Sequence, residues 1–196
     1  MKKVERSEIL DLGAYEQVRP RFRARVIEEK RGRRLAVSDE ISAVFENHDT
    51  ALLQIQEMLR TERITKESAI RHEIETYNEL VPADAELSAT MFVEIADNVV
   101  RDRRLVEMAG LEACIALEVL GTKVVGRNET RGVLPDRTTA VHYVKFPLGA
   151  ELASKLAARA RVEPEGAMFF IVDHPRLAAR KELPRAMVES LVEDLS

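Results

Sequence analysis

Apolar residues in the first half of the chain recur with helical spacing and predict two successive amphipathic helices. We expect the first to begin at a cap formed by Asn47 or Asp49 and to bury Leu52, Ile55, Met58 and Leu59. The second should follow a cap at Thr65, bury Ile70, Ile74, Tyr77, Leu80 and Val81, and end at Pro82. Together they predict a helical hairpin with a turn near Ile64.

In the segment before this hairpin, the spacing of apolar residues changes once, from that of helices to that of strands. Ser7 predicts the cap of a short helix that runs to Tyr15, and Pro20 predicts the first turn of another that runs to about Glu29. Alternating apolar residues then predict two strands, over 35–37 and 41–46, joined by a turn at 38–40.

Beyond Pro82 the pattern is mainly that of strands. Residues 87–95 alternate most clearly. Gly121-Thr122 predicts a type II′ turn between strands 114–120 and 123–127, and 128–137 reads as a loop. The remaining predicted elements are a helix over 99–110, a strand over 139–148, a helix over 150–161, a strand over 167–172 and a helix over 183–195 that begins near Pro184. We therefore expect an α+β fold in a single domain, with a mainly antiparallel sheet, the helical hairpin and additional packing helices.

Composition is consistent with a folded protein that needs neither disulfides nor metals for its core. The chain has 196 residues, a net charge of -4, 45% apolar residues and one cysteine, Cys114. A lone thiol in an apolar run is typical of a reducing compartment. The N-terminus lacks the apolar stretch of a signal peptide, and no run is long enough to span a membrane. These features predict a cytoplasmic protein.

Glu73 is the residue that most clearly points to chemistry, because it lies close to the apolar face of the second predicted helix. A carboxylate there must be paired, hydrated or protonated. We expect a ligand site that combines Glu73 with Gln56 across the hairpin, Tyr77 and Asn78 on the same helix, and Glu46 and Asp49 at the hairpin entrance. Such a set would hold a metal, a proton or a polar ligand. The alternative is structural: Glu73 pairs with Arg60 or Arg63 at the edge of the core.

Enzyme motifs are absent from the sequence. There is no phosphate-binding glycine loop, no nucleophile elbow and no pair of closely spaced cysteines. The segment His72-Glu73-Ile74-Glu75-Thr76 begins like a zinc protease helix but has Thr76 in place of the second histidine. The paired Glu-x-x-His motifs of a diiron bundle are missing as well. No reaction can be assigned from these residues.

A locally basic segment runs from Arg19 to Arg34 in this otherwise acidic chain. Such a segment can bind phosphate, nucleic acid or an acidic protein. Because Glu28 and Glu29 interrupt it and few aromatic residues accompany it, we favour a solvated helix with local ion pairs over a nucleic-acid site.

Several blocks of the sequence resemble one bacterial family, over nearly the whole chain. They are Ile9–Tyr15, Phe45–Asn47, Gln54–Arg60, Glu73–Asn78, Glu86–Thr90 and Val172–Pro175. The family is known as domain of unknown function 3501, and the resemblance implies no catalytic positions because the family has no assigned reaction. Its members are often encoded beside rubrerythrin and an iron-sulfur oxidoreductase, which implies a role near peroxide or oxygen stress. The missing cysteine and diiron motifs predict that this chain does not itself hold those cofactors.

Three functional hypotheses remain open, of which the last is a structural or small-ligand module with no redox connection. The first is a cytoplasmic accessory or binding protein that works with a rubrerythrin-like peroxide system through protein contacts, with the Arg19 to Arg34 segment as its docking surface. The second is an enzyme that binds a metal or a small ligand through the semi-buried carboxylates of the helical hairpin. We expect neither nucleic acid nor a membrane as a partner.

Overall fold

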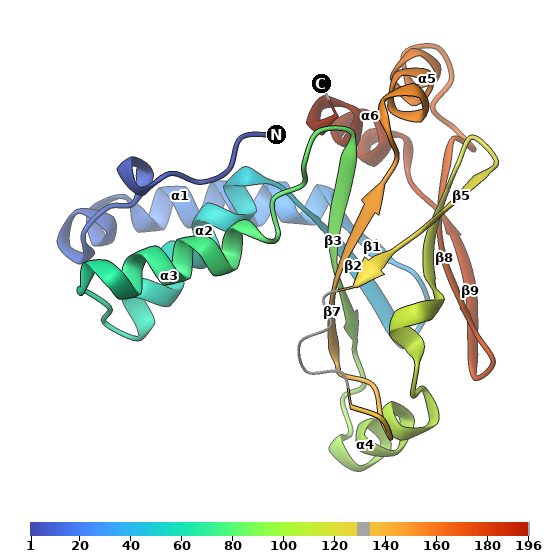
Figure 1. Ribbon diagram of the computed structural model, residues 1–196, viewed down its shortest axis with the longest axis horizontal. Helices are drawn as coiled ribbons and strands as arrows, with labels where there is room; N and C mark the ends of the chain where they lie inside the picture. The colour runs from blue at the N-terminus through green and yellow to red at the C-terminus, as the bar shows by residue number, and fades with distance from the viewer. Residues whose placement is uncertain (129–133, 196) are drawn as a thin grey trace.

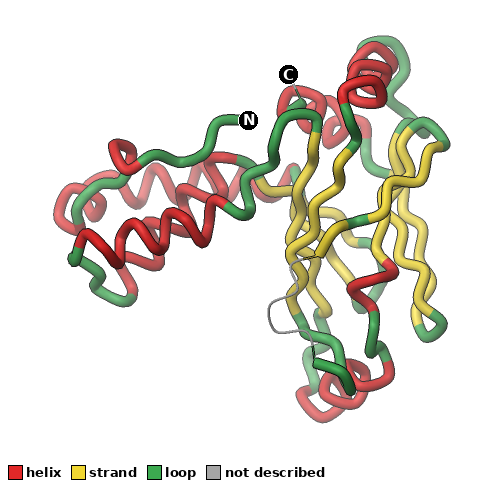
Figure 2. The backbone as a smooth tube through the Cα atoms, viewed as in Figure 1, coloured by secondary structure: helices red, strands yellow, loops and turns green. Residues whose placement is uncertain are grey.

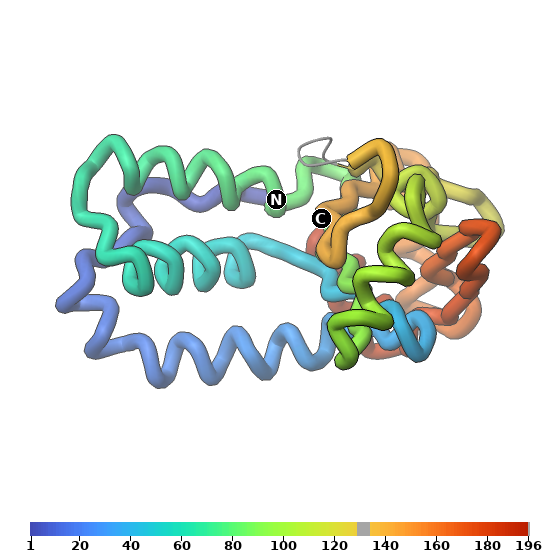
Figure 3. The backbone as a smooth tube through the Cα atoms, turned by 90° about the horizontal axis from the view of Figure 1, so that it is seen from below, coloured from blue at the N-terminus to red at the C-terminus, as the bar shows by residue number. Residues whose placement is uncertain are grey.

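The fold was analysed in a computed structural model, which describes residues 1–128 and 134–195. A helical arm projects sideways from a two-sheet β-sandwich (Figure 1). The arm consists of the N-terminal segment 1–10, which includes the short 3-10 helix η1 (Arg6–Glu8), and the helices α1 (Leu12–Gly32), α2 (His48–Thr61) and α3 (Glu67–Asn78). Seen from below, α1, α2 and α3 run alongside one another along the arm (Figure 3).

The sandwich consists of a five-stranded and a four-stranded sheet in which every neighbouring pair of strands is antiparallel. The first sheet has the order β1 (Arg34–Ala36), β2 (Ile41–Glu46), β3 (Glu86–Val93), β7 (Val141–Pro147), β6 (Arg127–Asn128). The second has the order β5 (Thr122–Val125), β4 (Ile115–Val119), β8 (Met168–His174), β9 (Leu177–Glu182). The predicted α+β class with antiparallel strands is confirmed.

Shorter helices close the two ends of the sandwich (Figure 1). One end carries α4 (Asn98–Glu107) and the 3-10 helix η2 (Leu111–Cys114), and the other carries α5 (Ala150–Ala160) and α6 (Arg185–Asp194). Helices therefore surround the strands at both ends and on the side of the arm (Figure 2). Among the described residues, no helix combines the length and the apolar character that a membrane span requires.

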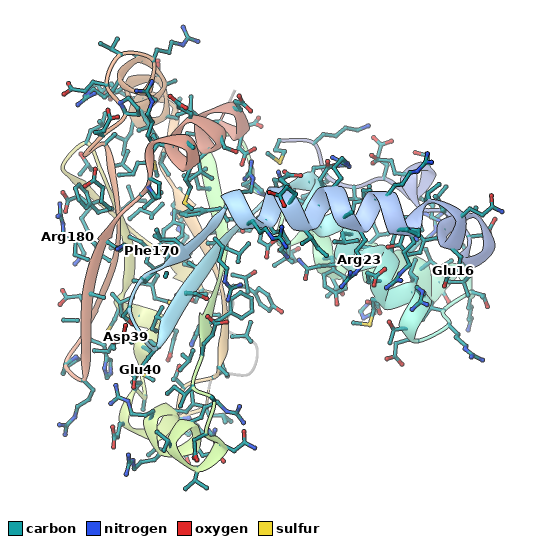
Figure 4. All side chains as sticks on the ribbon, turned by 180° about the vertical axis from the view of Figure 1, so that it is seen from behind. Glu16, Arg23, Asp39, Glu40, Phe170 and Arg180 are labelled. Carbon is teal, nitrogen blue, oxygen red and sulfur yellow. The ribbon has the colours of Figure 1, made fainter. Side chains whose placement is uncertain are left out.

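The sandwich and the arm have separate hydrophobic cores. Between the sheets, the ring of Phe170 packs edge-on against Phe45 and Phe146 at centroid distances of 6.4 and 5.9 Å (Figure 4). In the arm, Ile55 of α2 and Ile74 of α3 belong to a second cluster that also contains residues of the N-terminal segment. The arm therefore buries its own apolar surface. That the whole chain forms a single domain stays a prediction.

The N-terminal helices differ from the prediction. A single helix, α1, replaces the two helices expected on either side of Pro20, and Asp11 caps it by accepting a hydrogen bond from the Ala14 N–H. Proline in a helix interior removes a backbone hydrogen bond and is unfavourable. The fully buried side chains of Tyr15 and Val26 anchor the two halves of α1, so tertiary packing outweighs this local cost. Ser7 lies in η1 instead of capping a helix.

Two predicted turns and caps also need correction. Lys66, not Thr65, occupies the N-cap of α3, and its side chain makes no capping hydrogen bond. Val119 pairs with Thr122, so the turn residues of the β4–β5 hairpin are Leu120 and Gly121. Both have positive φ, 49° and 79°, which makes the turn type I′ instead of the predicted type II′.

Two strands were missed by the sequence analysis. In β9 four of the six side chains are exposed and none is fully buried, so the alternation that reveals a half-buried strand is weak. The two-residue strand β6 consists of the last residue of the predicted strand 123–127 and the first residue of the predicted loop 128–137. Residues 129–133 of that loop lie outside the described part of the chain.

Candidate functional site

Two of the predicted site residues, Gln56 and Asn78, hold the N-terminal segment against the arm. The Gln56 side chain accepts a hydrogen bond from the Leu10 N–H at 2.7 Å and donates one to the Leu10 carbonyl at 3.4 Å. Asn78 makes the same paired contact with the Val4 backbone, at 2.8 and 2.9 Å. Each amide therefore satisfies one buried or partly buried peptide unit, as a neighbouring strand would. Their described contacts are structural.

Asp49 faces α1 and takes part in a different set of contacts. Its carboxylate accepts a hydrogen bond from Arg25 at 2.5 Å and lies 3.1 Å from the imidazole of His48. Burial alone would raise the pKa of Asp49, but the hydrogen bonds from Arg25 and His48 outweigh it and hold the pKa below its usual range. Asp49 thus fastens the start of α2 to α1.

Glu73 and Tyr77 lie close to each other on a half-buried side of α3. Burial raises the pKa of the Tyr77 hydroxyl, and the charges of Glu73 and Tyr143 add to this effect. Tyr143 belongs to β7, so this side of α3 faces the five-stranded sheet. Arg60, one of the two partners expected for Glu73, donates instead to Glu16 at 2.5 Å.

Glu46 is the most deeply buried of the predicted carboxylates, with a side chain only 1% exposed. It lies at the end of β2, where it accepts a hydrogen bond of 2.6 Å from the Thr90 hydroxyl. The ammonium of Lys30 lies 3.7 Å away and the Gln54 amide 3.5 Å away. A cation from α1 and a hydroxyl from β3 therefore compensate this buried charge where the arm joins the sandwich.

The outer face of the five-stranded sheet carries a row of polar residues next to this junction. Strand register places Glu46 opposite Ser88, Ser88 opposite Lys145, and Lys145 opposite Arg127. The last three line a cavity of about 180 Å³, here called the corner pocket, between the end of α3 and the sheet. Among the described residues, its lining consists of Glu79, Ser88, Arg127, Asn128, Tyr143, Val144 and Lys145.

Sequence analysis missed most of the corner pocket. The alternation in residues 87–95 correctly assigns Ser88 to the polar face of its strand, opposite to Leu87 and Ala89. Lys145 alternates in the same way with Val144 and Phe146. The missing information was the pairing of β3 with β7, because these strands are separated by a long stretch of sequence.

A larger groove lies between α5 and α6. Its volume is about 880 Å³, and small side chains such as Ala153, Ser154 and Ala157 line much of it. Met1 and Asp84 border the same groove, with the N-terminal ammonium 3.1 Å from the Asp84 carboxylate. The described residues of the groove form a concave surface, but their side chains do not form an arrangement typical of a catalytic site.

The basic segment folds as most of α1 and the start of β1, and several of its arginines form internal ion pairs. Arg19 donates two hydrogen bonds to Glu57, at 2.7 and 2.8 Å, and Tyr15 donates a third. The bonds from Arg19 are the main reason why the pKa of Glu57 falls to about 2. Arg33 pairs with Asp194 in the same two-bonded geometry. Local ion pairing, which we favoured for this segment, is thus observed.

Metal ligands are not clustered in the described structure. Within residues 1–128 and 134–195, no group of three or more histidine, cysteine, aspartate or glutamate side chains is positioned to hold a metal ion. The predicted ligand site at Glu73 stays a prediction.

Comparison with known proteins gives a family but no activity. A family described as "Protein of unknown function (DUF3501)" matches residues 3–195. No curated protein matches the chain. A crystal structure of a novel protein of unknown function from Burkholderia pseudomallei K96243 is similar over 100% of both chains, with 30% sequence identity and a TM-score of 0.89. This chain therefore belongs to the DUF3501 family of proteins of unknown function.

Proposed function

We propose that this protein is a cytoplasmic accessory protein that binds an acidic partner protein through the outer surface of α1 and serves a rubrerythrin-like peroxide system. The observation that carries the proposal is the exposure of α1. This helix has 21 residues, of which only Tyr15 and Val26 are buried, and it forms one side of an arm that stands away from the sandwich (Figure 1). A long exposed helix on a projecting arm is accessible to a second protein.

The exposed surface of α1 combines positive charge with apolar area. Arg21, Arg23 and Arg25 are exposed, and Val18 is 43% exposed. The guanidinium of Arg25 also packs over the ring of Phe22 at 5.3 Å. Arginine and aromatic side chains are enriched in protein interfaces, because they offer both contact area and directional hydrogen bonds.

Two of these arginines form no direct ion pair in the described ranges, and the charge of Arg23 acts on Glu57 only at longer range, where it helps to lower the pKa of that carboxyl. Arg25 is paired with Asp49, whereas Arg21 and Arg23 form no ion pair with any other residue in the described ranges. Arg23 lies midway along the arm and Glu16 near its far end (Figure 4). The alternation of cations with Glu16 and Glu28 supports a protein partner over nucleic acid, since phosphate backbones favour a continuous basic surface.

The choice of partner rests on the family resemblance. Members are often encoded beside rubrerythrin and an iron-sulfur oxidoreductase, and an acidic face on either protein would complement Arg21 and Arg23. In this role the protein would position or stabilise a redox enzyme and would contribute no cofactor of its own.

Size-exclusion chromatography with light scattering tests the proposal. The purified chain is mixed with a rubrerythrin and an iron-sulfur oxidoreductase from the same organism. We expect a complex with one of them that is lost in the Arg21→Glu/Arg23→Glu variant. The Arg101→Glu/Arg103→Glu variant of α4 has the same change in net charge at a distant surface and should still bind. Absence of a complex with the wild-type protein would contradict the proposal.

The alternative, an enzyme that binds a metal or small ligand through carboxylates of the helical hairpin, has weaker support. Glu46 is already compensated by Lys30 and Thr90, and Asp49 by Arg25. Elemental analysis of the purified protein separates the two hypotheses. Stoichiometric metal that is lost in the Glu73→Gln variant would favour the alternative.

A further inference from the structure

We propose that the corner pocket binds a small phosphate, either the inorganic ion or the phosphate group of a small metabolite. Lys145 and Arg127 would supply positive charge, Ser88 a hydrogen-bond donor and Glu79 an acceptor for a protonated phosphate oxygen. This ligand site is separate from the α1 surface and does not depend on a partner protein.

The first argument is the juxtaposition of two cations. Arg127 of β6 lies directly opposite Lys145 of β7 in the strand register. Directly opposed side chains have Cβ atoms about 5 Å apart, and like charges at that distance destabilise a sheet. The ammonium of Lys145 lies 3.4 Å from Glu86, but the same Glu86 oxygen also accepts a hydrogen bond from the Ala83 N–H. Among the described residues, Arg127 has no acidic partner. An anion between the two cations would relieve their repulsion.

The second argument is a hydroxyl that opens onto the cavity. The Ser88 residue as a whole is only 3% exposed and lines the cavity, and its side chain forms no hydrogen bond with the described part of the protein. The two residues opposite Ser88 in the neighbouring strands are Glu46 and Lys145. A hydroxyl that faces the pocket and has no acceptor in the protein can donate a hydrogen bond to an oxyanion bound there. Glu46 would not repel such an ion strongly, because Lys30 lies 3.7 Å from its carboxylate.

The third argument is the size of the pocket and the presence of one acid. A volume of about 180 Å³ admits a phosphate group, because about 10 to 15 Å³ of such volume is enough for one water molecule. Glu79 lines the same cavity. Inorganic phosphate still carries a proton near neutral pH and can donate a hydrogen bond to a carboxylate, whereas sulfate is fully deprotonated and cannot. Glu79 therefore predicts selectivity for phosphate over sulfate.

Phosphate binding can be measured on the full chain by isothermal titration calorimetry with inorganic phosphate, at constant ionic strength. We expect saturable binding that weakens by about tenfold or more in Lys145→Gln and Ser88→Ala, since each removes a hydrogen bond to a charged ligand. Lys123→Gln removes a cation from β5, outside the pocket lining, and should bind like the wild type. Thermal unfolding establishes that each variant is folded before its affinity is compared.

Three comparisons of affinity test the proposal: phosphate with sulfate, phosphate with a phosphomonoester, and each variant with the wild type. Sulfate should bind more weakly than phosphate in the wild type, and Glu79→Gln should reduce this difference. Binding of a small phosphomonoester with higher affinity than inorganic phosphate would identify a metabolite as the ligand, and the reverse would identify the free ion. No saturable binding, or equal binding by Lys145→Gln and wild type, would overturn the proposal. Equal affinity for sulfate and phosphate would contradict the role of Glu79.

Discussion

Replacement of Asp194 by asparagine should destabilise the protein strongly, because it breaks a buried ion pair between distant parts of the chain. Asp194 lies at the end of α6, and Arg33 directly follows α1 where the arm meets the sandwich. The two guanidinium nitrogens Nη1 and Nη2 of Arg33 donate to the Asp194 carboxylate at 2.6 and 3.0 Å. The side chains are 5% and 8% exposed. In the Asp194→Asn variant the Arg33 charge stays buried, with only Glu29 left nearby at 3.6 Å.

The expected magnitude follows from burial. Removal of one partner from a buried ion pair costs about 3 to 5 kcal/mol, because the remaining charge is uncompensated. The chain contains a matched pair with similar geometry on the surface: Arg180 donates to Glu118 at 2.8 and 3.2 Å, with side chains 50% and 25% exposed. For an exposed pair the expected cost is only about 0.2 to 1 kcal/mol.

Urea unfolding at neutral pH measures this difference. The set comprises the wild type, Asp194→Asn, Arg33→Met, the double variant, and Glu118→Gln as the exposed control. The double variant should lose less stability than the sum of the two single variants, since it leaves neither charge unpaired. If Asp194→Asn costs no more than Glu118→Gln, or if the two single effects simply add, the ion pair does not fasten the arm junction to α6 and our reasoning is wrong.

Three further predictions concern other contacts. Gly126→Ala should lower the free energy of unfolding by about 1 to 3 kcal/mol in the same urea titration. The reason is that a Cβ atom there would lie 2.4 Å from Val144 Cγ1 and 3.0 Å from a backbone carbonyl. At Gly32 a Cβ atom would contact nothing, so Gly32→Ala should be neutral or slightly stabilising. Asn78→Ala should lower the free energy of unfolding by about 1 to 3 kcal/mol, because it leaves the buried peptide groups of Val4 without hydrogen bonds. Limited proteolysis should then cleave the N-terminal segment faster than in the wild type. An unchanged cleavage rate would contradict this role of Asn78. The pKa of Glu57 in the folded protein is about 2, below its ordinary value of 4.5. The stability that its ionised form contributes is therefore fully present above pH 4.5 and is lost as the pH falls toward 2. Glu57→Gln should lose less thermal stability than the wild type over that range, and pH profiles of the same slope for both proteins would refute this prediction.

Local patterns in the sequence were sufficient to predict several elements. Alternation identified β3, and helical spacing identified α2 and α3. Of the two predicted caps of α2, Asn47 is the one observed, and it accepts a hydrogen bond from the Thr50 N–H. These features depend on residues that are close in sequence, where spacing alone determines which side chains share a face.

Long-range partners could not be predicted in the same way. Asn78 and Gln56 have the composition of a ligand site, but their polar atoms bind Val4 and Leu10, which lie 74 and 46 residues away. The corner pocket depends equally on the pairing of β3 with β7 and of β7 with β6. Register between distant strands is set by the whole sheet, and one amphipathic strand is compatible with many partners.

The affinity of the acidic partner for α1, measured against salt concentration, tests the central claim most directly. Isothermal titration of the wild-type protein with the partner that forms a complex should give an affinity that falls as salt rises, because screening weakens the contacts of Arg21 and Arg23. Arg21→Glu/Arg23→Glu should weaken binding by at least about tenfold at low salt, whereas Arg101→Glu/Arg103→Glu should not. Equal affinity of the α1 variant and the wild type would contradict the account.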